Sequence, residues 1–120
     1  MTVVMPEQVE RRLIDLSKEL DSAVKECNAA EITFHKAKAE FEISMAKARM
    51  HAAEVFSERG VKATVQEKED QAILGTAQEM LNLADAEALV KASRQNVNCI
   101  RTQVDIARSV AASVRSSLEL

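Results

Sequence analysis

The sequence predicts an all-α protein, an antiparallel two-helix hairpin whose long, coiled-coil-like helices cover about residues 6–59 and 64–118. We expect this hairpin to assemble into a helical-bundle oligomer. Three observations support the fold class. The 120 residues include only two glycines and one proline, which leaves few places for turns. Residues that favour helices are plentiful, and aromatic residues make up 2% of the chain. Apolar side chains recur every seven residues in both halves, as they do along the contact line between paired helices.

The first helix is expected to begin at Pro6, because the first turn of a helix does not need the N–H group that proline lacks. Residues 1–5 are expected to form a short flexible N-terminus, and residues 1–120 a single helical-hairpin domain. Gly60 is expected to end the helix, since glycine readily adopts the left-handed conformation found there. The predicted buried rows of this helix are Leu13, Leu20, Cys27, Phe34, Phe41, Ala48 and Val55, and Leu16, Ala23, Ala30 and Ala37.

The second helix is expected to begin at Thr64, which forms with Glu67 the sequence pattern of a capping box. Its predicted buried rows are Leu83, Val90, Val97, Val104, Ala111 and Leu118, and Ala86, Ser93, Ile100, Ala107 and Val114. The first turns do not fit these rows, and the apolar face there is expected to consist of Ile73, Ala77, Met80 and Ala84, which indicates a local shift in phase. Gly75 lies in this stretch and indicates either a bend or a close contact between backbones.

A further set of apolar side chains, called here the off-row set, falls outside these rows. Its members are Val24, Ile32, Ile43, Met45, Met50, Phe56, Leu74, Leu81, Leu89, Ile106 and Val110. Scattered exposed apolar residues are normal, but a set of this size indicates a second buried surface. We expect it to be an interface between copies of the chain in a homo-oligomer. The alternative is a monomer that uses these residues to bind a different protein.

Four arginines follow one another at intervals of seven, and they are called here the arginine face: Arg94, Arg101, Arg108 and Arg115. Seven residues make almost two helical turns, so these side chains share one side of the helix. One interpretation is that they form ion pairs with the first helix. If residues whose numbers sum to about 123 lie opposite each other, Arg115 meets Glu10 and Arg94 meets Glu31. The other interpretation is that the face binds an anion from outside the chain.

Residues 89–118 carry five basic side chains, Lys91 and the four arginines, against one acid, Asp105. Arginine suits phosphate because its planar group donates two parallel hydrogen bonds. Arginines seven residues apart repeat about every 10.5 Å along a helix, so one face could follow several phosphates of a single strand. The chain has no Trp or Tyr to stack on bases. If the face binds nucleic acid, we therefore expect contacts to the phosphate backbone, little sequence preference and a steep salt dependence.

The sequence shows no pattern for catalysis or for a metal or cofactor site, and we do not expect an enzyme. The histidines His35 and His51 match no metal-binding spacing, and His51 is expected to be a core residue of the first helix. Cys27 and Cys99 lack the spacing of a zinc site and are expected to be buried reduced thiols. No signal-peptide pattern and no apolar run of about 20 residues is found, so we expect a cytoplasmic protein that uses no membrane and no small-molecule substrate.

The segments TVQEKEDQAIL (64–74) and NVNCIRTQVDIARSVAASVR (96–115), placed on a hairpin that covers nearly the whole chain, allow a comparison with known families. In these features the chain resembles small helical-hairpin proteins encoded by bacteriophages, often beside single-strand annealing or recombination genes. In architecture it is also similar to the UvsY-type phage recombination mediators. The resemblance implies an oligomer in the host cytoplasm that helps a recombinase or annealing protein handle single-stranded DNA. The alternative is an adaptor or inhibitor that docks a host or phage protein through the off-row set.

Overall fold

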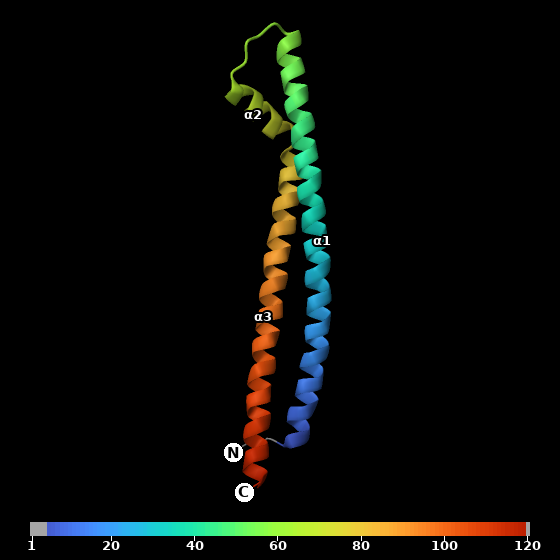
Figure 1. Cartoon of the computed structure of the whole chain (residues 1–120), viewed down its shortest axis with the longest axis vertical. Helices are drawn as coiled ribbons and strands as arrows, with labels where there is room; N and C mark the ends of the chain where they lie inside the picture. Colours follow the sequence, from blue (N-terminus) through green and yellow to red (C-terminus); the bar gives the residue numbers. More distant parts are fainter. Residues whose placement is uncertain (1–4, 120) are drawn as a thin grey trace. The chain divides into compact units, whose positions relative to one another are not determined.

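The computed structural model describes residues 5–119, and almost all of these residues are helical (Figure 1). Helix α1 spans Pro6–Glu58, α2 spans Val65–Gly75 and α3 spans Ala77–Glu119. The all-α prediction is confirmed. The prediction of one continuous helix over residues 64–118 is wrong, because Thr76 divides it into α2 and α3. Of the predicted N-terminal segment 1–5, only Met5 belongs to the described residues.

The end of α1 and the start of α2 are capped as the sequence predicts. Gly60 has a φ of 67°, its N–H donates to the Ser57 carbonyl at 3.1 Å, and the N–H of Val61 donates to the Phe56 carbonyl at 3.2 Å. These two bonds form the motif in which a left-handed glycine satisfies the last carbonyls of a helix. At the start of α2, the Thr64 hydroxyl accepts the N–H of Glu67 at 3.1 Å. The reciprocal bond of a capping box, from the Thr64 N–H to the Glu67 carboxylate, is not formed among the described residues.

The chain divides into two compact units, and unit 1 combines residues 1–29 with residues 91–120. Its core consists of Leu16, Ala23, Val97, Ile100 and Val104, with Leu20, Val24, Cys27 and Ala107 packed against it. All of these except Val24 belong to the predicted rows. Within this unit the two helical segments run in opposite directions, since Arg12 of α1 contacts Gln103 of α3 while Val24 borders the same hollow as Val97.

Two side chains of unit 1 lie differently from the prediction. Leu118 was expected in a buried row but is 68% exposed. Pro6, the first residue of α1, already borders a hollow with Val114, so α1 has no turn before Pro6 that could cover Leu118. Cys99 was expected to be buried but is exposed on α3, whereas Cys27 is half-buried.

Unit 2 comprises residues 30–90, and its α1 segment shows where a strict repeat of seven fails. Met45, expected in the off-row set, is 8% exposed, and Ala52 is fully buried. His51, expected in the core, is exposed. The reason is that the buried side of α1 continues from Phe41 to Met45, a step of four where the repeat of seven requires a step of three. Such a step corrects the drift of about 20° per seven residues between a straight helix and a heptad pattern.

The predicted shift in phase at the start of the second helix is wrong. Ile73, Ala77, Met80 and Ala84 are exposed. The side chains buried instead are Ala72 and Thr76, and Thr76 lies seven residues before Leu83. The second half of the chain therefore keeps its original pattern, with a polar residue at one buried position.

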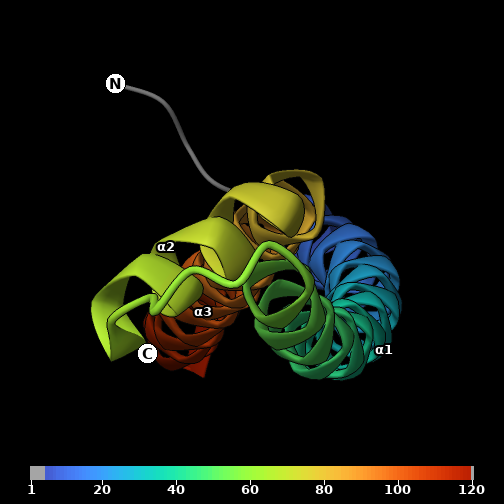
Figure 2. The same cartoon turned by 90° about the horizontal axis from the view of Figure 1, so that it is seen from above.

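The break between α2 and α3 is organised by Thr76, which is 1% exposed. Its N–H donates to the Ile73 carbonyl at 3.1 Å, one residue short of the normal α-helical partner, Ala72. Its hydroxyl donates to that Ala72 carbonyl at 3.0 Å and so replaces the missing backbone bond. The N–H of Met80 donates to the Thr76 carbonyl at 3.0 Å and begins α3. Figures 1 and 2 both show α2 leaving the direction of the first turns of α3 at this point.

Gly75 lies next to this break. Of the two explanations predicted for this glycine, the structure agrees with a bend and not with a close contact between backbones. A methyl group added at Gly75 would lie 3.9 Å from the Cβ of Ala48, which is ordinary van der Waals distance. An alanine would therefore be accommodated at position 75 without displacing α1.

Helices α1 and α2 are joined by an ion pair that the sequence did not predict. The Nε and Nη2 atoms of Arg49 donate to the two carboxylate oxygens of Glu69, at 3.0 and 2.8 Å. The hydrogen bond from Arg49 lowers the pKa of Glu69, and the same bond raises the pKa of Arg49. Both side chains reach solvent, so this pair adds little to stability.

Most of the off-row set is exposed in the single chain. Its exposed members are Ile32, Ile43, Met50, Leu74, Leu81, Leu89, Ile106 and Val110, while Val24 and Phe56 are half-buried and Met45 is buried. Among the described residues, no helix has an apolar stretch long enough to span a lipid bilayer.

Candidate nucleic-acid interface

The arginine face lies entirely within unit 1, on α3, and all four of its side chains are exposed. In a straight helix, positions seven residues apart drift by about 20°, so the four positions turn through roughly 60° from Arg94 to Arg115. They therefore remain on one side of α3. The core residues Val97, Ile100 and Val104 hold this part of α3 against α1.

The ion pair predicted between Arg115 and Glu10 is not formed among the described residues, although both side chains border the same hollow. The Nε atom of Arg115 instead donates weakly to the Ala111 carbonyl, one turn earlier, at 3.5 Å. The ion-pair interpretation therefore fails for Arg115. By contrast, Lys91 and Arg94 each have an interaction partner within the chain.

Arg101 and Arg108 differ from the other members of the face. Within residues 5–119, neither of them has a carboxylate within ion-pair distance. Asp105 is the nearest acid along α3, four residues after Arg101 and three before Arg108. Exposed acid–base pairs at these helical spacings contribute only about 0.2–0.5 kcal/mol each. Arg101 and Arg108 are therefore available to an external anion.

Arg94 and Arg101 border a hollow of about 270 Å³ between α1 and α3. Its apolar part is formed by Val24 and Val97, and its polar part includes Asn28 of α1 and Asn98 of α3. Asn98 lies on the same side of α3 as the arginines, four residues after Arg94 and three before Arg101. An amide side chain can both donate and accept hydrogen bonds, so this hollow offers donors to phosphate or sugar oxygens and acceptors to a base.

The two asparagines were not among the predicted site residues. Asn98 could have been found from its spacing to the arginines, since residues three and four apart share a helix face. Asn28 could not, because its place depends on which residues of α1 lie opposite the arginine face. Among residues 5–119, no group of His, Cys, Asp and Glu side chains is arranged to hold a metal ion.

Comparisons with protein-family models, with curated proteins and with solved structures find no match to this chain.

Proposed function

We propose that this chain is a non-enzymatic, oligomeric accessory protein that binds the phosphate backbone of single-stranded DNA through its arginine face. In this proposal its helices form an antiparallel hairpin, and it assists a phage recombinase or annealing protein. The observation that carries the proposal is the state of Arg101 and Arg108, which are exposed and, among the described residues, have no ion-pair partner. A guanidinium group in this state binds phosphate without first giving up another partner.

The position of the arginines on one side of a helix supports a linear polyanion rather than a single small ion. The spacing of about 10.5 Å along α3 lets successive side chains reach different phosphates of one strand. The hollow beside Arg94 and Arg101 adds the amides of Asn28 and Asn98, which suit the sugar and base edges of a strand whose bases are unpaired.

The proposal is tested by fluorescence anisotropy of a labelled single-stranded oligonucleotide, titrated with the protein at several salt concentrations. Each phosphate contact to a single strand contributes about −0.7 to the slope of log K against log salt, so four arginines give about −2.8. The double variant R101Q/R108Q is expected to bind more weakly and to reduce the magnitude of this slope by about 1.4.

The matched control is R11Q/R59Q, which removes the same charge from two exposed arginines outside the arginine face. It is expected to leave the slope unchanged. Absence of binding by the wild-type protein at low salt contradicts the proposal. Equal weakening by both double variants would show that net charge, not the arginine face, controls binding.

Circular dichroism during heating separates a binding role from a structural one. Because Arg101 and Arg108 have no ion pair to lose among residues 5–119, R101Q/R108Q is expected to change the free energy of unfolding by less than about 0.5 kcal/mol. A large loss of stability with DNA binding intact would instead support a role in holding α3 against α1.

The second candidate function is that of a protein adaptor or inhibitor, and the exposure of most of the off-row set favours it. Isolation of the tagged protein from a host or phage-infected extract would then recover a partner that remains bound after nuclease treatment. Under the DNA-binding proposal, nuclease treatment releases the nucleic acid and whatever is bound to it.

A further inference from the structure

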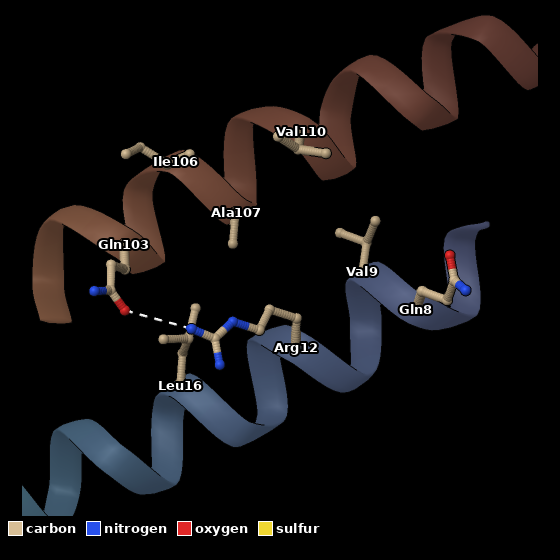
Figure 3. A pocket seen from close by; sticks show the side chains of 8 residues that line it. All are labelled: Gln8, Val9, Arg12, Leu16, Gln103, Ile106, Ala107 and Val110. Atoms are coloured by element: carbon tan, nitrogen blue, oxygen red, sulfur yellow. Dashed lines mark hydrogen bonds between the residues drawn. The ribbon is translucent and has the colours of Figure 1, made fainter. Parts of the chain in front are cut away.

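The groove of about 370 Å³ between α1 and α3 of unit 1 that Figure 3 shows offers little to an anion. Its basic side chain is Arg12, whose Nη2 atom donates to the Oε1 atom of Gln103 at 3.4 Å, the bond drawn in the figure. The Nη1 atom of Arg12 lies 3.8 Å from the Glu19 carboxylate. Since Arg12 already has two partners, an anion in this groove would have to displace one of them.

The hollow of about 270 Å³ bordered by Arg94 and Arg101, called here the asparagine hollow, has a different character. Two arginines line it and, among the described residues, no carboxylate does. Arg101 also has no ion-pair partner within residues 5–119. The charge at this hollow therefore complements a phosphate group.

The amides of Asn28 and Asn98 border the asparagine hollow from α1 and α3, and both residues are exposed. In the part of the chain that the structure describes, neither amide group has a hydrogen-bond partner; the bond from the Thr102 hydroxyl to Asn98, at 3.0 Å, uses the backbone carbonyl. Each amide can both donate and accept, whereas a phosphate oxygen only accepts. The two amides together therefore match the edge of a base, which carries donors and acceptors, better than they match phosphate.

The apolar part of the asparagine hollow consists of Val24, which is half-buried, and Val97, which is 6% exposed. A base that lies against these side chains removes apolar area of both partners from water. The hollow thus offers an apolar surface for the face of a base, amides for its edge and a cation for the neighbouring phosphate.

We propose that the asparagine hollow is a subsite for one unpaired base of a bound single strand. The face of the base lies against Val24 and Val97, and its edge exchanges hydrogen bonds with Asn28 and Asn98. Arg101 binds the adjacent phosphate. Because an amide can turn either its donor or its acceptor end to the base, the subsite requires a base but does not select one.

This inference rests on the proposed function and adds to it a reason for preferring single strands. In a duplex the edge of each base is occupied by its partner and its faces are stacked, so a base enters the subsite only after it is unpaired and unstacked. The arginine face alone gives no such preference, since both kinds of DNA present phosphates.

The test compares two labelled strands of the same length by fluorescence anisotropy, a thymidine oligonucleotide and a strand in which every residue is abasic. Both carry the same phosphates, so they differ only in what the subsite can bind. The wild-type protein is expected to bind the thymidine strand at least about fivefold more tightly, the effect of two neutral hydrogen bonds. The slope of log K against log salt is expected to be the same for both strands.

The variant N28A/N98A removes both amides and leaves every arginine in place. It is expected to bind the thymidine strand as weakly as the abasic strand, with an unchanged salt slope and unchanged affinity for duplex DNA. Both positions are exposed and alanine favours helix more than asparagine does, so wild-type helicity is expected by circular dichroism. The matched control is N82A/N96A, which removes two exposed asparagines that do not line the hollow and is expected to behave as the wild type.

The outcomes separate this inference from the proposed function. Equal wild-type affinity for the two strands, with a normal salt slope, overturns the base subsite and leaves binding to the phosphate backbone intact. Weakening of the abasic strand by N28A/N98A, or equal weakening of the thymidine strand by N82A/N96A, also overturns the subsite. Absence of wild-type binding to either strand at low salt overturns both proposals.

Discussion

The hydroxyl of Thr76 offers the sharpest test of how the second half of the chain is divided into two helices. Thr76→Val keeps the branched shape of the side chain and removes the hydrogen bond of 3.0 Å to the Ala72 carbonyl. Ala72 is 1% exposed, so water does not replace that bond. A buried carbonyl left without a partner costs about 1–3 kcal/mol. The contact of the hydroxyl with the Met45 sulfur, at 3.9 Å, adds little because a thioether is a weak acceptor.

The free energy of unfolding is measured by urea denaturation followed by circular dichroism, at one protein concentration because the stability of any self-associating chain depends on concentration. Thr76→Ser is the control: it keeps the hydroxyl and loses one methyl group, which costs about 0.8 kcal/mol. Wild-type stability in Thr76→Val, together with increased helicity, would refute the reasoning. That result would mean that the residue 76 N–H has returned to the Ala72 carbonyl and that α2 and α3 have joined into one helix.

Three further predictions concern unit 2 and its connection. Gly75→Ala is expected to raise the free energy of unfolding by about 0.4–1 kcal/mol, since the added methyl group meets no atom closer than 3.9 Å; urea denaturation that shows a loss would contradict this. Thr64→Ala removes the acceptor for the Glu67 N–H and is expected to cost about 1 kcal/mol in the same assay, with Thr64→Ser near wild type. The lowered pKa of Glu69 means that its pair with Arg49 stabilises the fold above the carboxyl's unfolded pKa, and that this stabilisation is lost as the pH falls through the folded pKa. The difference in melting temperature between the wild type and Glu69→Gln should therefore be present at neutral pH and disappear at strongly acidic pH, and a difference independent of pH would exclude this role.

The buried rows of unit 1 could be predicted from the sequence because they follow a simple repeat. Leu16, Ala23, Val97 and Val104 are separated by sevens within each helix, and all four lie in the core. Helix ends were predictable for a similar reason, since Gly60 and Thr64 are residue types with specific backbone roles.

The break at Thr76 and the step at Met45 could not be predicted by the same reasoning. An apolar pattern does not reveal a buried threonine, because its polarity places it on the exposed side when residues are sorted by hydropathy. In α1 the change from a step of three to a step of four depends on how far a straight helix drifts from its partner, which is a property of packing. His51 and Met45 were therefore assigned to each other's environments.

The arginine face was predictable because a spacing of seven depends only on helix geometry. The partners of its arginines were not, since they depend on which turn of α1 lies opposite. The pairing of Arg115 with Glu10 assumed one such alignment and fails within the described residues. For the same reason the sequence did not identify Asn28 as a site residue, although Asn28 borders the hollow beside Arg101.

The composition of unit 1 from both ends of the chain has a consequence for folding. Unit 2 is continuous in sequence and can form from local contacts, whereas unit 1 must bring together segments separated by residues 30–90. Closing a flexible loop of that length costs roughly 3–4 kcal/mol in chain entropy, so prior folding of unit 2 would shorten the search. During synthesis, the basic segment of α3 can find its partner in α1 only after translation has passed residue 91, and a ribosome that stalls near residue 90 would leave α1 residues 6–29 with an uncovered apolar row.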